Sequence, residues 1–109
     1  MNKYGARRTW SNLCDREFVS KAEARRGEEL RYLELAGEIT DLEYQPSWVL
    51  CGDKGHKTRY SADFKYVQQG ETIVEDVKGM MTEAARVRMN WLWQLYGIEV
   101  KIVKRGDSR

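Results

Sequence analysis

The chain has 109 residues, which suits one domain rather than two, and its 19 basic and 17 acidic side chains leave a net charge of +2. Four Trp, six Tyr and two Phe supply large apolar side chains, so intrinsic disorder is not expected. No apolar run approaches the roughly 20 residues of a membrane span, and no hydrophobic stretch follows the basic N-terminus as in a signal peptide. We therefore expect a single domain over residues 1–109, in the cytoplasm and without a membrane partner.

Cysteine and histidine usage limits the kinds of site. Cys14 and Cys51 lie far apart and outside any Cys-x-x-Cys pair, so two unpaired thiols are favoured over a disulfide. The one histidine, His56, excludes zinc sites and nuclease motifs that need several histidines. A Ser-His-Asp triad would also have to use His56, and a solvated loop histidine is the favoured interpretation.

The small net charge conceals an uneven distribution. Residues 1–26 carry seven basic and three acidic side chains, residues 27–46 one and six, and residues 79–109 six and three. Basic ends on either side of an acidic segment suit nucleic-acid binding. On charge alone, solvated faces explain the pattern equally well.

The first third of the chain predicts one helix. Residues 1–19 have weak periodicity and are interpreted as a basic arm or irregular lead-in. Ser20 is a good N-cap, Glu23 stands three residues later, and Gly37 follows the last turn, so we predict a helix over residues 20–36.

The middle of the chain predicts strands. Short strand candidates at residues 39–44 and 48–51 precede a polar, glycine-rich loop. Residues 59–67 alternate in polarity and predict one strand, with Tyr60, Ala62, Phe64 and Tyr66 on one face. A turn at residues 68–70 connects it to a second strand at residues 72–78, which completes a β-hairpin.

The last third predicts a helix and a strand. Thr82 caps a helix that runs to about Tyr96 and stops at Gly97, and residues 98–103 alternate as a final strand. The helix has a wide apolar surface, made by Ala84, Ala85, Val87, Trp91, Leu92 and Leu95. A hairpin strand followed by a helix and a strand implies a βαβ crossover. We predict a mixed sheet with a helix on each side, an α/β or α+β fold, ending in a polar tail at residues 104–109.

Three carboxylates and one lysine are candidates for chemistry. Asp76 and Lys78 share one face of their strand, and Asp63 is almost as far from the hairpin turn as Asp76, so the two aspartates should lie close. Glu23 shares a helix stripe with Leu30 and should face the sheet. Carboxylates held together repel one another unless a cation or proton intervenes, and hard oxygen ligands suit Mg²⁺ or Mn²⁺.

Each of these residues also has a structural interpretation. Glu23 fits a capping box with Ser20, Asp76 and Lys78 fit an exposed ion pair, and Asp63 fits an outward polar position. The order in which the four residues occur favours the functional interpretation over these.

The motifs that carry this order resemble the PD-(D/E)xK nuclease superfamily. More narrowly, they resemble a group of small phage and prophage proteins classed as a domain of unknown function. The matching segments are KYGA at 3–6, SKAEA at 20–24, LEYQP at 42–46, ADF at 62–64 and VEDVKG at 74–79. The resemblance covers most of the chain, from Lys3 to about Ile98.

The resemblance implies a restriction-endonuclease-like core of helix, three-stranded antiparallel meander, helix and a further strand. Asp63 matches the motif Asp, Asp76 the (D/E) and Lys78 the Lys. Glu23 matches the first-helix Glu of archaeal-type Holliday-junction resolvases. Ala62 replaces the proline of the family pattern, a departure that removes no chemical group.

The resemblance also implies a mechanism. Asp63, Asp76 and the backbone carbonyl of Val77 would hold Mg²⁺ (Mn²⁺ being an alternative), and Glu23 would complete the site directly or through water. The metal would polarise the phosphate and lower the pKa of a bound water. Lys78 would orient that water and stabilise charge in the transition state.

DNA contacts are expected from the basic ends, where phosphate binding positions the substrate without reading its sequence. The candidate residues are Lys3, Arg7, Arg8, Lys21, Arg25, Arg26, Arg86 and Arg88. Trp93 falls opposite Trp91 on its helix and is a candidate interface anchor, with core packing of both as the alternative. A homodimer would place two active sites on a symmetric junction.

The expected function is therefore a metal-dependent, phage-type DNA endonuclease that hydrolyses phosphodiester bonds and resembles a Holliday-junction resolvase, acting in the host cell cytoplasm if a phage encodes it. A less selective nicking or flap endonuclease for phage replication or packaging is the alternative within this class. From other classes, a nucleic-acid-binding protein without turnover and a small dimeric interaction protein remain open.

Overall fold

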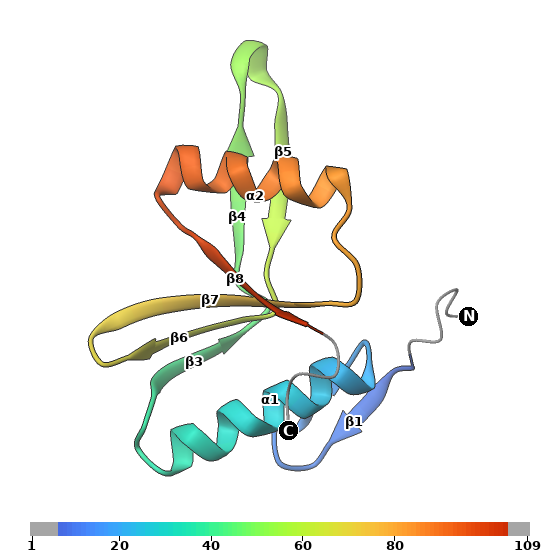
Figure 1. The fold of residues 1–109 in the computed structure, drawn as a ribbon, viewed down its shortest axis with the longest axis vertical. Helices are drawn as coiled ribbons and strands as arrows, with labels where there is room; N and C mark the ends of the chain where they lie inside the picture. The colour runs from blue at the N-terminus through green and yellow to red at the C-terminus, as the bar shows by residue number, and fades with distance from the viewer. Residues whose placement is uncertain (1–6, 105–109) are drawn as a thin grey trace.

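A mixed four-stranded sheet organises the molecule (Figure 1). The computed structural model describes residues 7–104. The strand order is β3-β6-β7-β8, with antiparallel pairs except for the parallel pair β7–β8. The strands of this sheet are β3 (Thr40–Tyr44), β6 (Phe64–Gln68), β7 (Glu71–Lys78) and β8 (Val100–Lys104). The predicted α+β fold with a mixed sheet is confirmed, including the parallel strand that follows the second helix.

Local signals set both helices. In α1 (Lys21–Leu35), Ser20 Oγ accepts a hydrogen bond from the backbone N–H of Glu23 at 3.1 Å. In α2 (Glu83–Tyr96), Thr82 caps the first turn in the same way and Gly97 ends the helix in a left-handed conformation. Both predicted helices are confirmed, because a cap acts within one turn of chain and needs no distant partner.

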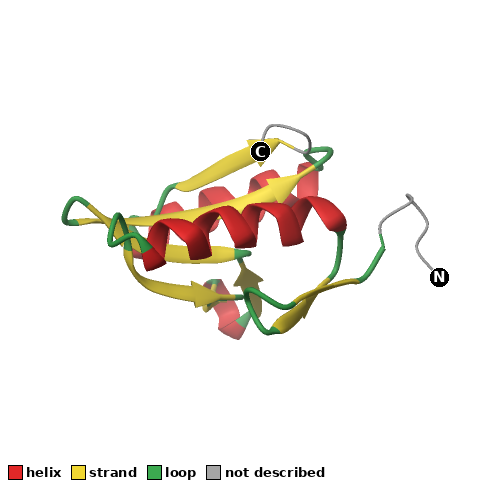
Figure 2. Ribbon diagram, turned by 90° about the horizontal axis from the view of Figure 1, so that it is seen from below, coloured by secondary structure: helices red, strands yellow, loops and turns green. Residues whose placement is uncertain are grey.

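The helices cover opposite faces of the sheet, and each face has its own core (Figure 1). Figure 2 looks from below, with α1 in front of the strands. The α1 core consists of Phe18, Ala24, Leu30, Ile39, Phe64 and Tyr66. The α2 core consists of Leu50, Tyr60, Ala62, Val74 and Leu92. The prediction for α2 is only partly confirmed, because Leu92 is buried whereas Val87 and Leu95 are exposed.

The predicted single strand at residues 59–67 is wrong. It is two strands, β5 (Lys57–Ser61) and β6, and β5 pairs with β4 (Ser47–Cys51) in a separate hairpin beside α2. The backbone changes partners at the break: Ala62 N–H donates to Pro46 O, whereas Asp63 N–H donates to Glu75 O. Tyr60 and Tyr66 therefore lie in different cores and not on one face.

The interpretation of residues 1–19 as an irregular lead-in is also wrong for much of its length. β1 (Thr9–Ser11) and β2 (Arg16–Phe18) form an antiparallel hairpin, and Phe18 is buried in the α1 core. Gly27 allows that approach, because a Cβ there would lie 2.7 Å from Phe18 Cζ. Strands of three residues are too short to show a period in the sequence.

Two further observations concern expectations about the chain. Cys14 and Cys51 are free thiols, as predicted. Within residues 7–104, no helix has the length and apolar character needed to cross a membrane. Lys3 and most of the polar tail lie outside the described residues.

Candidate active site

The four candidate residues come from three elements that meet beside the C-terminal half of β7. Asp63 lies at the break between β5 and β6, Asp76 and Lys78 lie on β7, and Glu23 lies in the first turn of α1. The β6–β7 register pairs Phe64 with Glu75, as the equal distances from the turn predicted. Asp63 is fixed to β7 by two hydrogen bonds: its N–H donates to Glu75 O at 3.0 Å, and its Oδ2 accepts from Val77 N at 2.8 Å.

Asp76 is almost completely buried, with 3% of its surface exposed. Its Oδ2 accepts a hydrogen bond from the Tyr60 hydroxyl and lies 3.6 Å from Lys78 Nζ. This geometry differs from the exposed ion pair that was the structural alternative for Asp76 and Lys78. The electrostatic interaction between this buried carboxylate and the half-buried ammonium group is strong, because little water screens it.

Glu23 faces the interior, as its helix stripe predicted, and is 3% exposed. Its Oε2 accepts a hydrogen bond from Gln45 Nε2 at 3.0 Å. Gln45 has a left-handed backbone, with φ of 55°, and its N–H donates to Asp63 O at 3.0 Å. The left-handed conformation of a non-glycine residue costs about 1–3 kcal/mol. The two hydrogen bonds of Gln45, to Glu23 and to Asp63, hold it in that conformation.

Gln45 is a site residue that the sequence analysis did not identify as one. It belongs to the LEYQP segment at residues 42–46, which carried the family resemblance without a stated role. Its place between a buried glutamate and the Asp63 backbone gives that segment a physical role. The signal available in the sequence was a polar residue directly before the one proline.

The carboxylates have too little positive charge near them. Burial and the charges of Glu23 and Asp76 raise the pKa of Asp63 to about 7, because the Val77 N–H and Lys78 oppose them only in part. Burial also raises the pKa of Glu23, which Arg16 opposes and Asp76 reinforces. Strongly perturbed carboxylates of this kind are more frequent at functional sites than elsewhere, which makes this cluster a candidate.

Arg16 is a second residue that the sequence analysis missed. Its guanidinium lies 4.6 Å from the centre of the Tyr44 ring, and its Nε is buried without a hydrogen-bond partner. It lies near enough to Glu23 to lower that residue's pKa. No signal marked it, because it lies in the segment interpreted as irregular.

The donor set fits a hard divalent cation in its chemistry. Within residues 7–104, no three Asp, Glu, His or Cys side chains are already grouped at metal-ligating separations. The hydrogen bonds described above engage one oxygen each of Asp63, Asp76 and Glu23. The second oxygen of each carboxylate is free of those bonds, and oxygen donors of this type suit Mg²⁺ and Mn²⁺.

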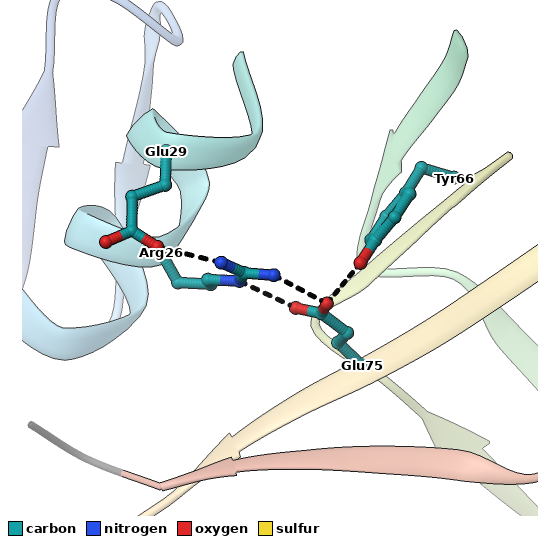
Figure 3. A network of polar contacts seen from close by, with 4 residues as sticks. All are labelled: Arg26, Glu29, Tyr66 and Glu75. Atoms are coloured by element: carbon teal, nitrogen blue, oxygen red, sulfur yellow. Dashed lines mark hydrogen bonds and ion pairs between the residues drawn. The ribbon is translucent and has the colours of Figure 1, made fainter. Parts of the chain in front are cut away.

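Arg26, predicted as a DNA contact, is engaged in contacts within the protein. Its guanidinium forms two hydrogen bonds of 2.8 Å with the buried Glu75 and one of 2.8 Å with Glu29, and Tyr66 also donates to Glu75 (Figure 3). The side chain is 18% exposed. Arg26 therefore connects α1 to β7, and three of its five N–H donors bind carboxylates of the protein itself.

The other predicted DNA contacts lie on the surface where they are described. Lys21 and Arg25 are exposed on α1, near Glu23, and Arg86 and Arg88 are exposed at the start of α2. Arg7 and Arg8 are exposed as well, although Arg8 pairs with Glu17 at 3.1 Å. Lys3 lies outside the described residues.

Comparison with known proteins gives a family but no activity. No curated protein and no solved structure matches the chain. One family model matches residues 1–105, almost the full length, and its description is "Protein of unknown function (DUF1064)". The chain therefore belongs to the DUF1064 family.

Proposed function

We propose that this protein is a metal-dependent DNA endonuclease that hydrolyses phosphodiester bonds. The observation that supports the proposal best is that Glu23 and Asp76 lie near enough to Asp63 for their charges, together with burial, to raise its pKa to about 7. A divalent cation would relieve the repulsion between these charges, and it can also polarise a phosphodiester and lower the pKa of a bound water. The resemblance to the PD-(D/E)xK superfamily points to the same chemistry.

In this proposal Asp63, Asp76 and the Val77 carbonyl hold Mg²⁺ or Mn²⁺, and Glu23 completes the set. The metal, when bound, supplies Lewis acidity and a water of lowered pKa. Lys78 has its Nζ 3.6 Å from Asp76, so it can orient a water and stabilise charge on the phosphate. Tyr60 and Gln45 act on carboxylates only, because they hold Asp76 and Glu23 in place.

The proposed substrate is branched DNA such as a four-way junction. Exposed basic side chains on α1 and α2, among them Lys21, Arg25 and Arg86, can contact the backbone on either side of the carboxylates. A second copy of the chain would supply the second cut. Trp93 is 54% exposed and lines a hollow of about 690 Å³ at the opposite end of β7 from Lys78, which suits such a contact.

The test compares a labelled four-way junction with linear duplexes of the same arm sequences, in Mg²⁺, with Asp76→Asn beside the wild type. We expect paired symmetric cuts in the junction, with the rate lowered at least about 1,000-fold in the variant. An Asp53→Asn variant, which removes an exposed carboxylate, should cut like the wild type.

The other outcomes select the alternatives. Equal nicking of junction and duplex would retain the nuclease and replace the resolvase with a less selective enzyme. DNA binding without any metal-dependent cutting would select a binding protein. Neither binding nor cutting would leave an interaction protein whose carboxylates have no catalytic use.

A further inference from the structure

A second polar cleft adjoins the carboxylates on the α2 side of the sheet. It has a volume of about 270 Å³ and lies between β5, the end of β7 and the first half of α2. Its lining consists of Arg59, Tyr60, Ser61, Lys78, Ala85 and Arg88. Three of these six side chains are cationic and none is acidic, so the cleft is suited to an anion.

The two arginines of this cleft have no ion-pair partner among residues 7–104. Among the ion pairs of residues 7–104, neither Arg59 nor Arg88 takes part in one. Arg59 Nη1 donates to the neutral hydroxyl of Ser47 at 2.9 Å, which leaves its charge uncompensated. Lys78, by contrast, already has Asp76 beside it. An anion that entered the cleft would meet two arginine charges that no carboxylate of the described residues neutralises in an ion pair.

The cleft and the carboxylate site share a wall. Tyr60 and Lys78 line the cleft, and both contact Asp76. Arg88 also lies close enough to Tyr60 for its charge to act on the hydroxyl. A group held in the cleft is therefore a direct neighbour of whatever lies on the carboxylates.

The size and chemistry of the cleft select the ligand. Its volume falls just below the roughly 300–1,000 Å³ of pockets that enclose drug-sized molecules. Arginine recognises phosphate through paired N–H donors, and the Ser61 hydroxyl is one more donor at the rim. A phosphodiester group with part of its sugar has the right size and charge.

We propose that the Arg59–Arg88 cleft binds a phosphate of the nucleic-acid strand next to the phosphate held at the carboxylates. This rests on the proposed function, because the same strand must supply both phosphates. The cleft then fixes the strand on the leaving side or the attacking side of the cut, and Arg59, on the β4–β5 hairpin, becomes a positioning residue.

The probe is thymidine 3′,5′-bisphosphate, titrated into the full chain in EDTA and followed by calorimetry. Arg59→Gln and Arg88→Gln should each weaken binding about 10-fold, the loss expected for one charge-assisted contact. Lys57→Gln is the matched control, because it removes one exposed positive charge from the same strand as Arg59, outside the cleft. This control should change affinity less than about two-fold.

Equal losses in all three variants would overturn the proposal, since they would show general electrostatic attraction. Wild-type affinity in both cleft variants would overturn it as well. The nuclease proposal is judged separately by wild-type cutting of DNA in Mg²⁺. If wild-type protein does not cut but the cleft variants alone lose the bisphosphate, the phosphate site is supported and only the nuclease proposal fails.

Discussion

Two neighbouring buried carboxylates on β7 have opposite surroundings. Glu75 faces α1, where Arg26 and Tyr66 satisfy both of its oxygens (Figure 3). Asp76 faces the other side of the strand, with Tyr60 and Lys78. Burial alone would raise the pKa of Glu75, but the bonds from Arg26 and Tyr66 outweigh burial and lower it.

Asp63 and Glu23, whose pKa values are influenced by the Asp76 charge, have raised pKa values instead. The direction of the pKa shift therefore distinguishes a carboxylate paired within the fold from the candidate site carboxylates. A carboxylate whose charge is fully matched holds the fold together, and carboxylates left with excess negative charge are available to bind a cation.

The largest effect is expected from removing the cation that pairs with Glu75. Arg26→Met leaves Glu75 buried without its cation and should lower the free energy of unfolding by about 3–5 kcal/mol. Arg26→Met with Glu75→Gln should recover most of the loss, since no buried charge then lacks a partner and Tyr66 keeps an acceptor. Urea unfolding measures both. A double variant as unstable as the single one would contradict this account.

A divalent cation bound at the carboxylates near Asp76 should stabilise the folded protein. At about 100 times its dissociation constant, Mg²⁺ should add roughly 2.7 kcal/mol to the stability of the wild type. Asp63→Asn should abolish that gain, because it removes a ligand and part of the repulsion together. Thermal unfolding with and without Mg²⁺ measures the effect, with Asp53→Asn as the control that keeps it. An equal gain in Asp63→Asn would remove the metal from these carboxylates.

The smallest expected effect is a pH dependence in metal-free protein. The pKa of Asp63 rises from its ordinary value of 3.8 to about 7 on folding, so the folded state holds a proton that the unfolded state has lost. Stability contributed by this group is therefore present at low pH and lost as pH rises through about 7. Solvent around this partly exposed side chain reduces the size of the effect.

Denaturant unfolding between pH 5 and pH 8 measures how the free energy of unfolding changes with pH in the wild type and in two variants. Asp63→Asn should flatten the curve relative to the wild type. Asp41→Asn makes the same change at an exposed residue whose φ of 56° an asparagine accepts, and it should leave the curve as it is. A slope unchanged in Asp63→Asn would mean that other groups cause it.

Features that depend on residues close together along the chain could be predicted from the sequence alone. Ser20 and Thr82 begin the helices through bonds to residues three positions on, and Gly97 ends one through its own backbone freedom. The turn at residues 68–70 set the β6–β7 register, and that register brought Asp63 beside β7. The candidate site was predictable because its aspartates lie on one hairpin.

Features that depend on residues distant along the chain could be found only from the tertiary structure. Arg26 and Arg25 are adjacent basic residues, yet one pairs with Glu75, 49 positions along the chain, and the other is exposed. The break after Ser61 depends on Pro46 and Glu75 as hydrogen-bond partners, which no alternation in residues 59–67 can reveal. Gln45, Arg16 and the Arg59–Arg88 cleft likewise result from packing, because burial and charge compensation are properties of three-dimensional neighbours and not of spacing.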